Sequence, residues 1–267
     1  MKRIIVLIFL STFLTLSVYA GSDGKIELSK KSEASVKDCF EGLNRGIFTF
    51  NQALDAAVFE PLAKGYRYLP SPIRTGTSNA VSNISTLLSI PNNVLQGDIG
   101  VAGKNTVRFI INSSIGILGL FDFATPLGFD DYQKEDFGQT LGRWGTNSGC
   151  YFVLPILGPT TVRDSIGLVG NIFIDPIYHI THNSEIHNGL LGNDNYSEHS
   201  YYYYRGTSAV DFRSKNIESF DSLEKNSIDL YATVKSLYIQ ERNKKIANSE
   251  SIVGTQDSDD WEEIDTN

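Results

Sequence analysis

The side chains best suited to chemistry gather in two short stretches of the 267-residue sequence. Three histidines and a glutamate occur in "HITHNSEIH" (179–187), and histidines three residues apart on a helix can share a metal ion. The zincin pattern, in which two histidines four apart enclose a glutamate, is absent. Because Asp175-Pro176 and a polar run flank the histidines, we expect a surface loop and no metal site.

The second stretch is a group of four carboxylates, Asp130, Asp131, Glu135 and Asp136. Two carboxyl groups can serve as the acid and base of a glycosidase, but clustering beside glycines and a tyrosine is typical of a solvated turn. The segment "DIGVAGKNT" (98–106) has Asp and Asn where a phosphate-binding loop needs Gly and Ser or Thr, and no Gly-x-Ser-x-Gly elbow occurs. We therefore expect neither enzyme activity nor a cofactor.

The charge of the chain is uneven and gives no sign of a nucleic-acid partner. The formal net charge is −8, yet the last segment, 246–267, holds seven carboxylates and no lysine or arginine. The remainder is close to neutral, so no basic surface for nucleic acid is expected. The acidic segment is polar and aperiodic, which predicts a disordered tail that either docks a basic partner or stays solvated.

The first twenty residues have the pattern of a secretory signal peptide. Lys2 and Arg3 precede an apolar run (4–16) that is shorter than the roughly 20 residues needed to cross a bilayer. We expect cleavage after Ala20 and a linker at 21–35. A bacterial lipoprotein needs a cysteine directly after the apolar run, whereas the first cysteine is Cys39, so we expect export without a lipid anchor.

Helical periodicity dominates from residue 36 onward. One face of the first helix carries Leu43, Ile47, Leu54 and Val58. We expect Pro61 to end this helix, Pro72 to open the next and Pro91 to end that one, because proline fits a first turn and breaks a helix interior. A capping box at Thr161–Asp164 and an acidic first turn after Ser227 mark two later helices. These signals predict an all-α, single-domain protein at 36–245.

Two apolar stretches are unusual for a soluble helical protein, "FIINSSIGILGLF" (109–121) and "CYFVLPILG" (150–158). Neither is long enough to span a bilayer. They can be core segments, which periodicity alone favours, or segments that dip into one leaflet of a membrane. The two cysteines, Cys39 and Cys150, leave a similar choice between a disulfide, as is common after export, and two separate buried thiols.

Five longer motifs occur in one order, "DCFEGLNRGIFTFNQALD" (38–55), "LQGDIG" (95–100), "RFIINSSIGILGLFD" (108–122), "EDFGQTLGRWGTNSGCYFVLPILGPTTVRDSIG" (135–167) and "VDFRSKNIESFDSLEKNSIDLYATVKSLYIQER" (210–242). Together they resemble the MlaA (VacJ) family of outer-membrane lipid-transport proteins over residues 38–245. The resemblance implies a ring-like, all-α domain embedded in one leaflet, the periplasmic leaflet of the Gram-negative outer membrane, around an amphipathic channel.

The function implied by the resemblance is retrograde phospholipid transport. The family removes mislocalised phospholipids from the outer leaflet and passes them to a soluble periplasmic carrier (MlaC-like), usually beside a trimeric porin. No cofactor and no bond-breaking step are implied. A different interpretation remains open, namely a secreted surface or interaction protein that acts in spreading or adhesion without moving lipid.

Within that family framework, four polar residues are candidates for a lipid headgroup path, Arg45, Gln139, Arg143 and Arg163. Arginine suits a phosphate because its planar guanidinium offers several donors. The alternative for each is a structural ion pair, for instance Arg163 with Asp164. The resemblance also bears on the cysteines, because Cys39 and Cys150 stand where the family pattern has prolines. That double replacement favours a Cys39–Cys150 disulfide.

Overall fold

The computed structural model describes residues 36–129, 134–182 and 199–247. The expected signal peptide and linker, and the acidic tail beyond Ala247, lie outside these residues. In chain order the elements are α2 (Glu41–Leu54), the π-helix η1 (Asp55–Phe59), α3 (Glu60–Arg67), α4 (Ser71–Leu95), α5 (Ile99–Ser114), the 3-10 helix η2 (Thr125–Leu127), α6 (Phe137–Arg143), β1 (Tyr151–Leu154), β2 (Gly158–Thr161), α7 (Val162–Ile174), α8 (Pro176–His182), α10 (Ser200–Lys215), α11 (Ile217–Asn226) and α12 (Leu230–Ile246). Helices dominate, as the sequence predicts.

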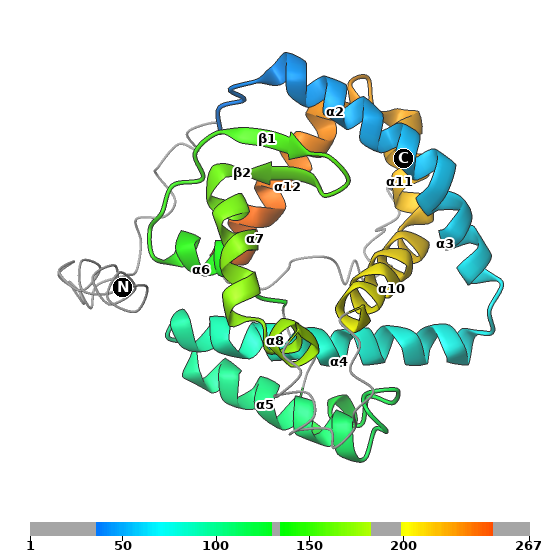
Figure 1. The fold of residues 1–267 in the computed structure, drawn as a ribbon, viewed down its shortest axis with the longest axis vertical. Helices are drawn as coiled ribbons and strands as arrows, with labels where there is room; N and C mark the ends of the chain where they lie inside the picture. The colour runs from blue at the N-terminus through cyan, green and yellow to red at the C-terminus, as the bar shows by residue number, and fades with distance from the viewer. Residues whose placement is uncertain (1–35, 130–133, 183–198, 248–267) are drawn as a thin grey trace, which may run out of the picture. The chain divides into compact units, whose positions relative to one another are not determined.

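The elements belong to one unit of the chain, Val36–Asn267, and their contacts close a ring (Figure 1). Strand β1 packs on α2, β2 on α7, α7 on α6 and α6 on α4. Helix α4 contacts α10, and α10 contacts α3, which continues from α2 through η1. Helix α12 joins β2 to α6, and α5 lies along α4. The ring-like arrangement expected from the resemblance is therefore present.

Proline behaves differently from the expectation at two of three positions. Pro72 opens α4 as predicted, but Pro91 lies inside that helix, which continues to Leu95. Pro61 does not end a helix either, because it occupies the first turn of α3 directly after the π-helical turn η1. The wider π-turn offsets the backbone at the point where the proline ring would otherwise clash with the preceding turn.

Of the two predicted helix starts, the one at Thr161 is confirmed and the one at Ser227 is wrong by two residues. The Thr161 side chain accepts a hydrogen bond from the Asp164 backbone N–H at 3.2 Å. The last helix starts two residues later than its sequence signal, because the Asp229 carboxylate is the cap and accepts from the Ala232 N–H at 3.1 Å. These side chains satisfy backbone donors that the first turn of a helix leaves unpaired.

A short antiparallel hairpin adds to the expected all-α fold. Strands β1 and β2 pair from Tyr151–Thr161 to Leu154–Gly158. Four residues per strand are too few for a period-two pattern to stand out in the sequence. The side chains of Tyr151 and Val153 point into a small apolar cluster with Tyr231 of α12.

The distribution of polarity is inverted relative to that of a soluble protein. Among the described residues, twenty-one buried side chains are polar or charged and seven are hydrophobic. Large apolar side chains are instead exposed, including Leu118 at 76% and Phe173 at 73%. The stripe that α7 presents (Val162, Ile166, Val169 and Phe173) is exposed along its whole length. Such an extensive apolar surface marks contact with a membrane or with protein partners.

The two apolar stretches of the sequence differ in their placement. The first, 109–121, ends α5 and forms the following turn, and Ile115, Ile117 and Leu118 are exposed, so the core interpretation favoured by periodicity is wrong there. The second is divided, since Tyr151 and Val153 are buried whereas Ile156 and Leu157 at the hairpin tip are exposed. None of the described helices is long and apolar enough to cross a bilayer.

A disulfide joins Cys39 to Cys150, with the two Cα atoms 5.6 Å apart. It ties the start of α2 to the start of β1, where Asp38 and Tyr151 also form an isolated parallel bridge. Both cysteines of the sequence are used, so neither thiol is free to carry an acyl chain.

The disulfide should stabilise the ring more than it stabilises the individual helices. We predict that replacing both cysteines by serine lowers the free energy of unfolding by up to about 4–5 kcal/mol, because the bond closes a long loop in the unfolded chain. Thermal unfolding followed by circular dichroism measures the effect, and wild-type protein in reductant should match the variant. Equal melting temperatures with and without reductant would contradict the prediction.

Candidate functional site

A polar seam lies between α4 and α5. Small polar side chains that are buried on α4 face buried polar side chains of α5. The Asn105 amide donates to the Asn93 side-chain oxygen at 2.8 Å, and the Asn83 amide donates to Ser113 Oγ at 2.8 Å. Because buried polar groups need partners, these amide pairs fix one helix against the other.

Asn112 and Asp122 shape the exposed apolar turn that follows α5. The Asn112 side-chain oxygen accepts from the N–H groups of Phe123 and Ala124 at 2.9 and 3.0 Å, and its amide donates to Asp122 at 3.0 Å. Burial alone would raise the pKa of Asp122, but hydrogen bonds from Thr125 and Asn112 hold it at about 2. The carboxylate is therefore charged at neutral pH.

The turn held in this way carries unusual backbone. Ile117 and Leu118 have φ of 52° and 57°, the left-handed region that is costly for such side chains. Gly119 follows with φ of 89°, and a Cβ there would stand 2.6 Å from the Cβ of Asn83. The polar contacts beneath the turn keep its large apolar side chains pointing outward.

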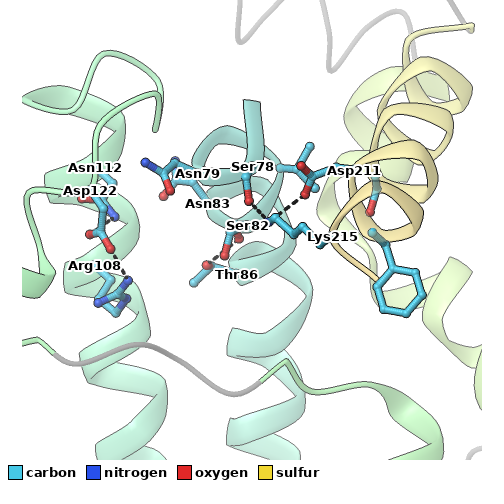
Figure 2. Close-up of a pocket in the computed structure, with 13 residues that line it drawn as sticks. Ser78, Asn79, Ser82, Asn83, Thr86, Arg108, Asn112, Asp122, Asp211 and Lys215 are labelled. Carbon is cyan, nitrogen blue, oxygen red and sulfur yellow. Dashed lines mark hydrogen bonds and ion pairs between the residues drawn. The ribbon is translucent and has the colours of Figure 1, made fainter. Parts of the chain in front are cut away.

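A cavity of about 330 Å³ opens between α4, α5 and α10 (Figure 2). Its lining is mostly polar and comprises Ser78, Asn79, Val81, Ser82, Asn83, Thr86, Arg108, Asn112, Asp122, Ser208, Asp211, Phe212 and Lys215. Arg108 pairs with Asp122 at 3.2 Å on the α5 side, and Lys215 pairs with Asp211 at 2.9 Å on α10. The cavity can therefore accommodate a small polar or charged group.

A second buried network joins α6, α7 and α12 through Arg242. Its guanidinium donates to Asp136 at 2.6 and 2.8 Å and to Asp164 at 2.9 Å. Asp164 also accepts from Tyr238 at 2.6 Å. Burial opposes ionisation, but the bond from Arg242 brings the pKa of Asp164 down to about 2. Removing either partner would leave a buried charge uncompensated, which typically costs about 3–5 kcal/mol.

Close packing supports this network. Gly167 of α7 lies against the first turn of α6, where a Cβ would come within 2.4 Å of the Gly138 nitrogen. Only glycine allows the two helices to approach this closely. The glycines of the 135–167 stretch are thus explained in part by contact between helices.

Of the four residues predicted for a lipid path, Gln139 and Arg163 both belong to the Arg242 network, since Gln139 bonds to Asp136 and Arg163 to Asp164, whereas Arg45 and Arg143 have other partners. Arg45 of α2 pairs with Glu41 and Asp229, both at 2.8 Å. Arg163 is buried and pairs with Asp164 at 3.0 Å. Gln139 is 1% exposed, and its amide donates to the Lys134 carbonyl at 3.0 Å. Arg143 is partly exposed and lies 3.5 Å from Asp98. Their role in a lipid path stays a prediction.

The expectation of a solvated turn at the carboxylate cluster is wrong for its described members. Glu135 is only 3% exposed, and Asp136 caps α6 and binds Arg242. Burial raises the pKa of Glu135 from 4.5 to about 7. The Gln96 amide donates to this carboxylate at 2.8 Å. Asp130 and Asp131 lie outside the described residues.

The histidine stretch also departs from the expected loop. His179 and His182 belong to helix α8, and the His182 ring stacks on Tyr178 with centroids 4.1 Å apart. The rest of "HITHNSEIH" lies outside the described residues. Within the described ranges, no three His, Cys, Asp or Glu side chains are grouped as a metal site would require.

Sequence reasoning did not single out the charged residues of the cavity. Arg108 and Asp122 flank the apolar stretch 109–121, and Asp211 and Lys215 lie in "VDFRSK". Their position in the sequence could have identified them, because charged residues that border or interrupt an apolar segment often face a polar interior. The spacing of Asp211 and Lys215, four residues apart on a helix, is also that of an ion pair.

Fold and cavity together define a class of protein, a helical ring that exposes many large apolar side chains and buries mostly polar and charged ones. The family model described as MlaA lipoprotein matches residues 36–245. The chain belongs to this family.

Several known proteins are similar to the chain. The "Intermembrane phospholipid transport system lipoprotein MlaA" of Haemophilus influenzae is 30% identical over 263 residues, covering 97% of this chain and 96% of that protein. The protein of the same name in Escherichia coli is 30% identical and covers 79% and 78%. "Uncharacterized protein RP093" of Rickettsia prowazekii is 39% identical over 150 residues, and the chain spans 59% of its length.

One solved structure is similar in fold, with a TM-score of 0.65 and 28% identity. The match covers 79% of this chain and 99% of that one. It was described under the heading "Structural basis for maintenance of bacterial outer membrane lipid asymmetry".

The raised pKa of Glu135 predicts a specific pH dependence of stability. The pKa of Glu135 is about 7 in the folded chain and 4.5 in the unfolded chain, so between these pH values only the folded chain keeps the proton. Its contribution to stability is therefore full below 4.5 and is lost as the pH rises through about 7. In the Glu135→Gln variant, the free energy of unfolding should fall less steeply over this pH range than in the wild-type protein. Denaturant unfolding between pH 4.5 and 8 measures it, and an unchanged decline in the variant would contradict the assignment.

Proposed function

We propose that this protein transports phospholipid at the outer membrane of a Gram-negative cell. It takes molecules that have strayed to the outer leaflet and passes them to a soluble, MlaC-like periplasmic carrier, which maintains lipid asymmetry. No bond is broken and no cofactor takes part. The observation that carries this proposal is the inverted polarity, a large exposed apolar surface around a polar interior, in a chain of the MlaA family. No observation favours the alternative of a secreted adhesion or spreading protein.

The apolar surface also supports a place in one leaflet. Each large apolar side chain removed from water contributes about 1.5–3 kcal/mol, so the exposed side chains of α5 and its following turn would hold the ring in hydrocarbon. A single acyl chain, by comparison, gives only marginal binding. The proposal is that the exported chain, cleaved after Ala20, sits on the periplasmic side of the outer membrane without a lipid anchor. A trimeric porin is the expected neighbour.

Lipid extraction tests the proposal directly. We expect the protein, purified from outer membranes in mild detergent, to retain about one or more phospholipid molecules per chain, because mild detergent covers exposed apolar faces but leaves a specifically bound lipid in place. Mass spectrometry of the extract identifies and counts the lipid. A lipid-free chain that stays monomeric without detergent would refute transport, and steady hydrolysis of added phospholipid would indicate an enzyme instead.

Among the four candidate path residues, Arg143 is the one we propose to meet a headgroup. Among the ion pairs of the three candidate arginines, its pair with Asp98 is the longest, at 3.5 Å, and its side chain is 33% exposed. We predict that Arg143→Ala slows lipid transfer by about tenfold with little change in melting temperature, since charge-assisted hydrogen bonds contribute about 1.5–3 kcal/mol. Arg163→Ala is the comparison and should mainly lower the melting temperature. Normal transfer with a lowered melting temperature would make Arg143 a structural residue.

A further inference from the structure

The polar cavity beside α4 carries charges of both signs in equal number. Its lining contains two cations, Arg108 and Lys215, and two carboxylates, Asp122 and Asp211. A site built only for phosphate would be expected to present excess positive charge. The balance in this cavity instead suits a ligand that itself carries one positive and one negative group.

The two ion pairs differ in how firmly they are held. Arg108 is buried and donates to Thr125 Oγ1 at 3.1 Å and to the Phe129 carbonyl as well as to Asp122. Its donors are therefore committed to structure. The Lys215 side chain is 54% exposed and binds Asp211 and Ser78 through a flexible stem. An ammonium group of this kind can exchange one partner for another at little cost.

The Lys215–Asp211 pair also stands between two cavities. A second hollow of about 320 Å³ is lined by Tyr66, Ser71, Arg74, Thr75, Ser78, Asn79, Asp211, Ser214 and Lys215. Four of these residues, Ser78, Asn79, Asp211 and Lys215, line the first cavity as well. Both hollows are at the lower end of the roughly 300–1,000 Å³ range of ligand pockets, so either can hold a headgroup but not a lipid with two acyl chains.

We propose that the Lys215–Asp211 pair selects phospholipids whose headgroup carries both a phosphate and a primary ammonium. The inference rests on the proposed transport function and names its substrate class. The phosphate binds Lys215, and the ammonium binds Asp211, so one internal ion pair is replaced by two pairs with the ligand. A purely anionic headgroup would also bind Lys215, but it would leave the Asp211 carboxylate, whose side chain is 8% exposed, without its cation.

The experiment compares ligands on the full-length protein in mild detergent. Short-chain phosphatidylethanolamine, short-chain phosphatidylglycerol and free phosphoethanolamine are each titrated, and native mass spectrometry measures the bound fraction. We expect wild-type protein to bind the ethanolamine lipid at least about tenfold more tightly than the glycerol lipid, since a buried carboxylate left without a cation is costly even though Tyr66 still donates to it. Free phosphoethanolamine should bind more weakly than the lipid.

Three variants sharpen the comparison. Asp211→Asn should bring the two lipids to similar affinity, and Lys215→Gln should weaken both, whereas Lys215→Arg should restore binding. Lys104→Gln is the matched control, because this exposed lysine of α5 lies outside the cavity lining and its loss should change nothing. Circular dichroism checks that each variant is folded. If a variant does not fold, the ratio of the two lipid affinities in the wild-type protein tests the selectivity by itself.

The outcomes separate this inference from the proposed function. Equal wild-type affinity for the two lipids, or an unchanged ratio in folded Asp211→Asn, overturns the selectivity while leaving transport intact. Wild-type protein that binds neither lipid refutes both. Free phosphoethanolamine that binds as tightly as its lipid would make a soluble amine phosphate the ligand and overturn the assignment to lipid.

Discussion

Arginine–aspartate pairs between distant segments hold this ring together. Arg213 of α10 binds Asp55 of η1 at 2.8 Å, Arg45 of α2 binds Asp229 at 2.8 Å, and Arg242 of α12 binds the carboxylates of α6 and α7. In most proteins a shared apolar core brings helices together. Here the apolar cluster around Tyr151 and Tyr231 is small, and the charged pairs make the long-range connections instead.

That constraint explains why the outer surface can be apolar. The buried faces of α4 and α5, which contact each other, carry asparagines, serines and an arginine. The large apolar side chains are then left exposed. Buried polar groups are costly unless each has a partner, so the amide pairs of the seam and the carboxylate partners of the arginines depend on one another. The result is a protein that exposes apolar side chains and buries polar and charged ones.

The sequence predicted the helices, the Thr161 cap and the opening of α4 at Pro72, because these depend on local backbone chemistry. It failed where the outcome depends on surroundings. Periodicity reports which residues share a helical face, but not whether that face meets protein or lipid, so for the stretch 109–121 it favoured a core over contact with a leaflet without deciding between them. Glu135 looked solvated because no local signal shows that α4 covers it. Pro61 was expected to end a helix because no sequence pattern indicates the π-helical turn that precedes it.

We propose that the exposed apolar turn after α5 lies in hydrocarbon. Phe121 is 54% exposed in this turn, and the sequence has two tryptophans, Trp144 and Trp261, that can be replaced by phenylalanine. With Phe121→Trp as the sole tryptophan, its fluorescence in bilayers of acyl-chain-brominated phospholipid reports contact with the chains. We expect strong quenching by the brominated chains and little by aqueous acrylamide. A tryptophan quenched by acrylamide but not by bromine would contradict it.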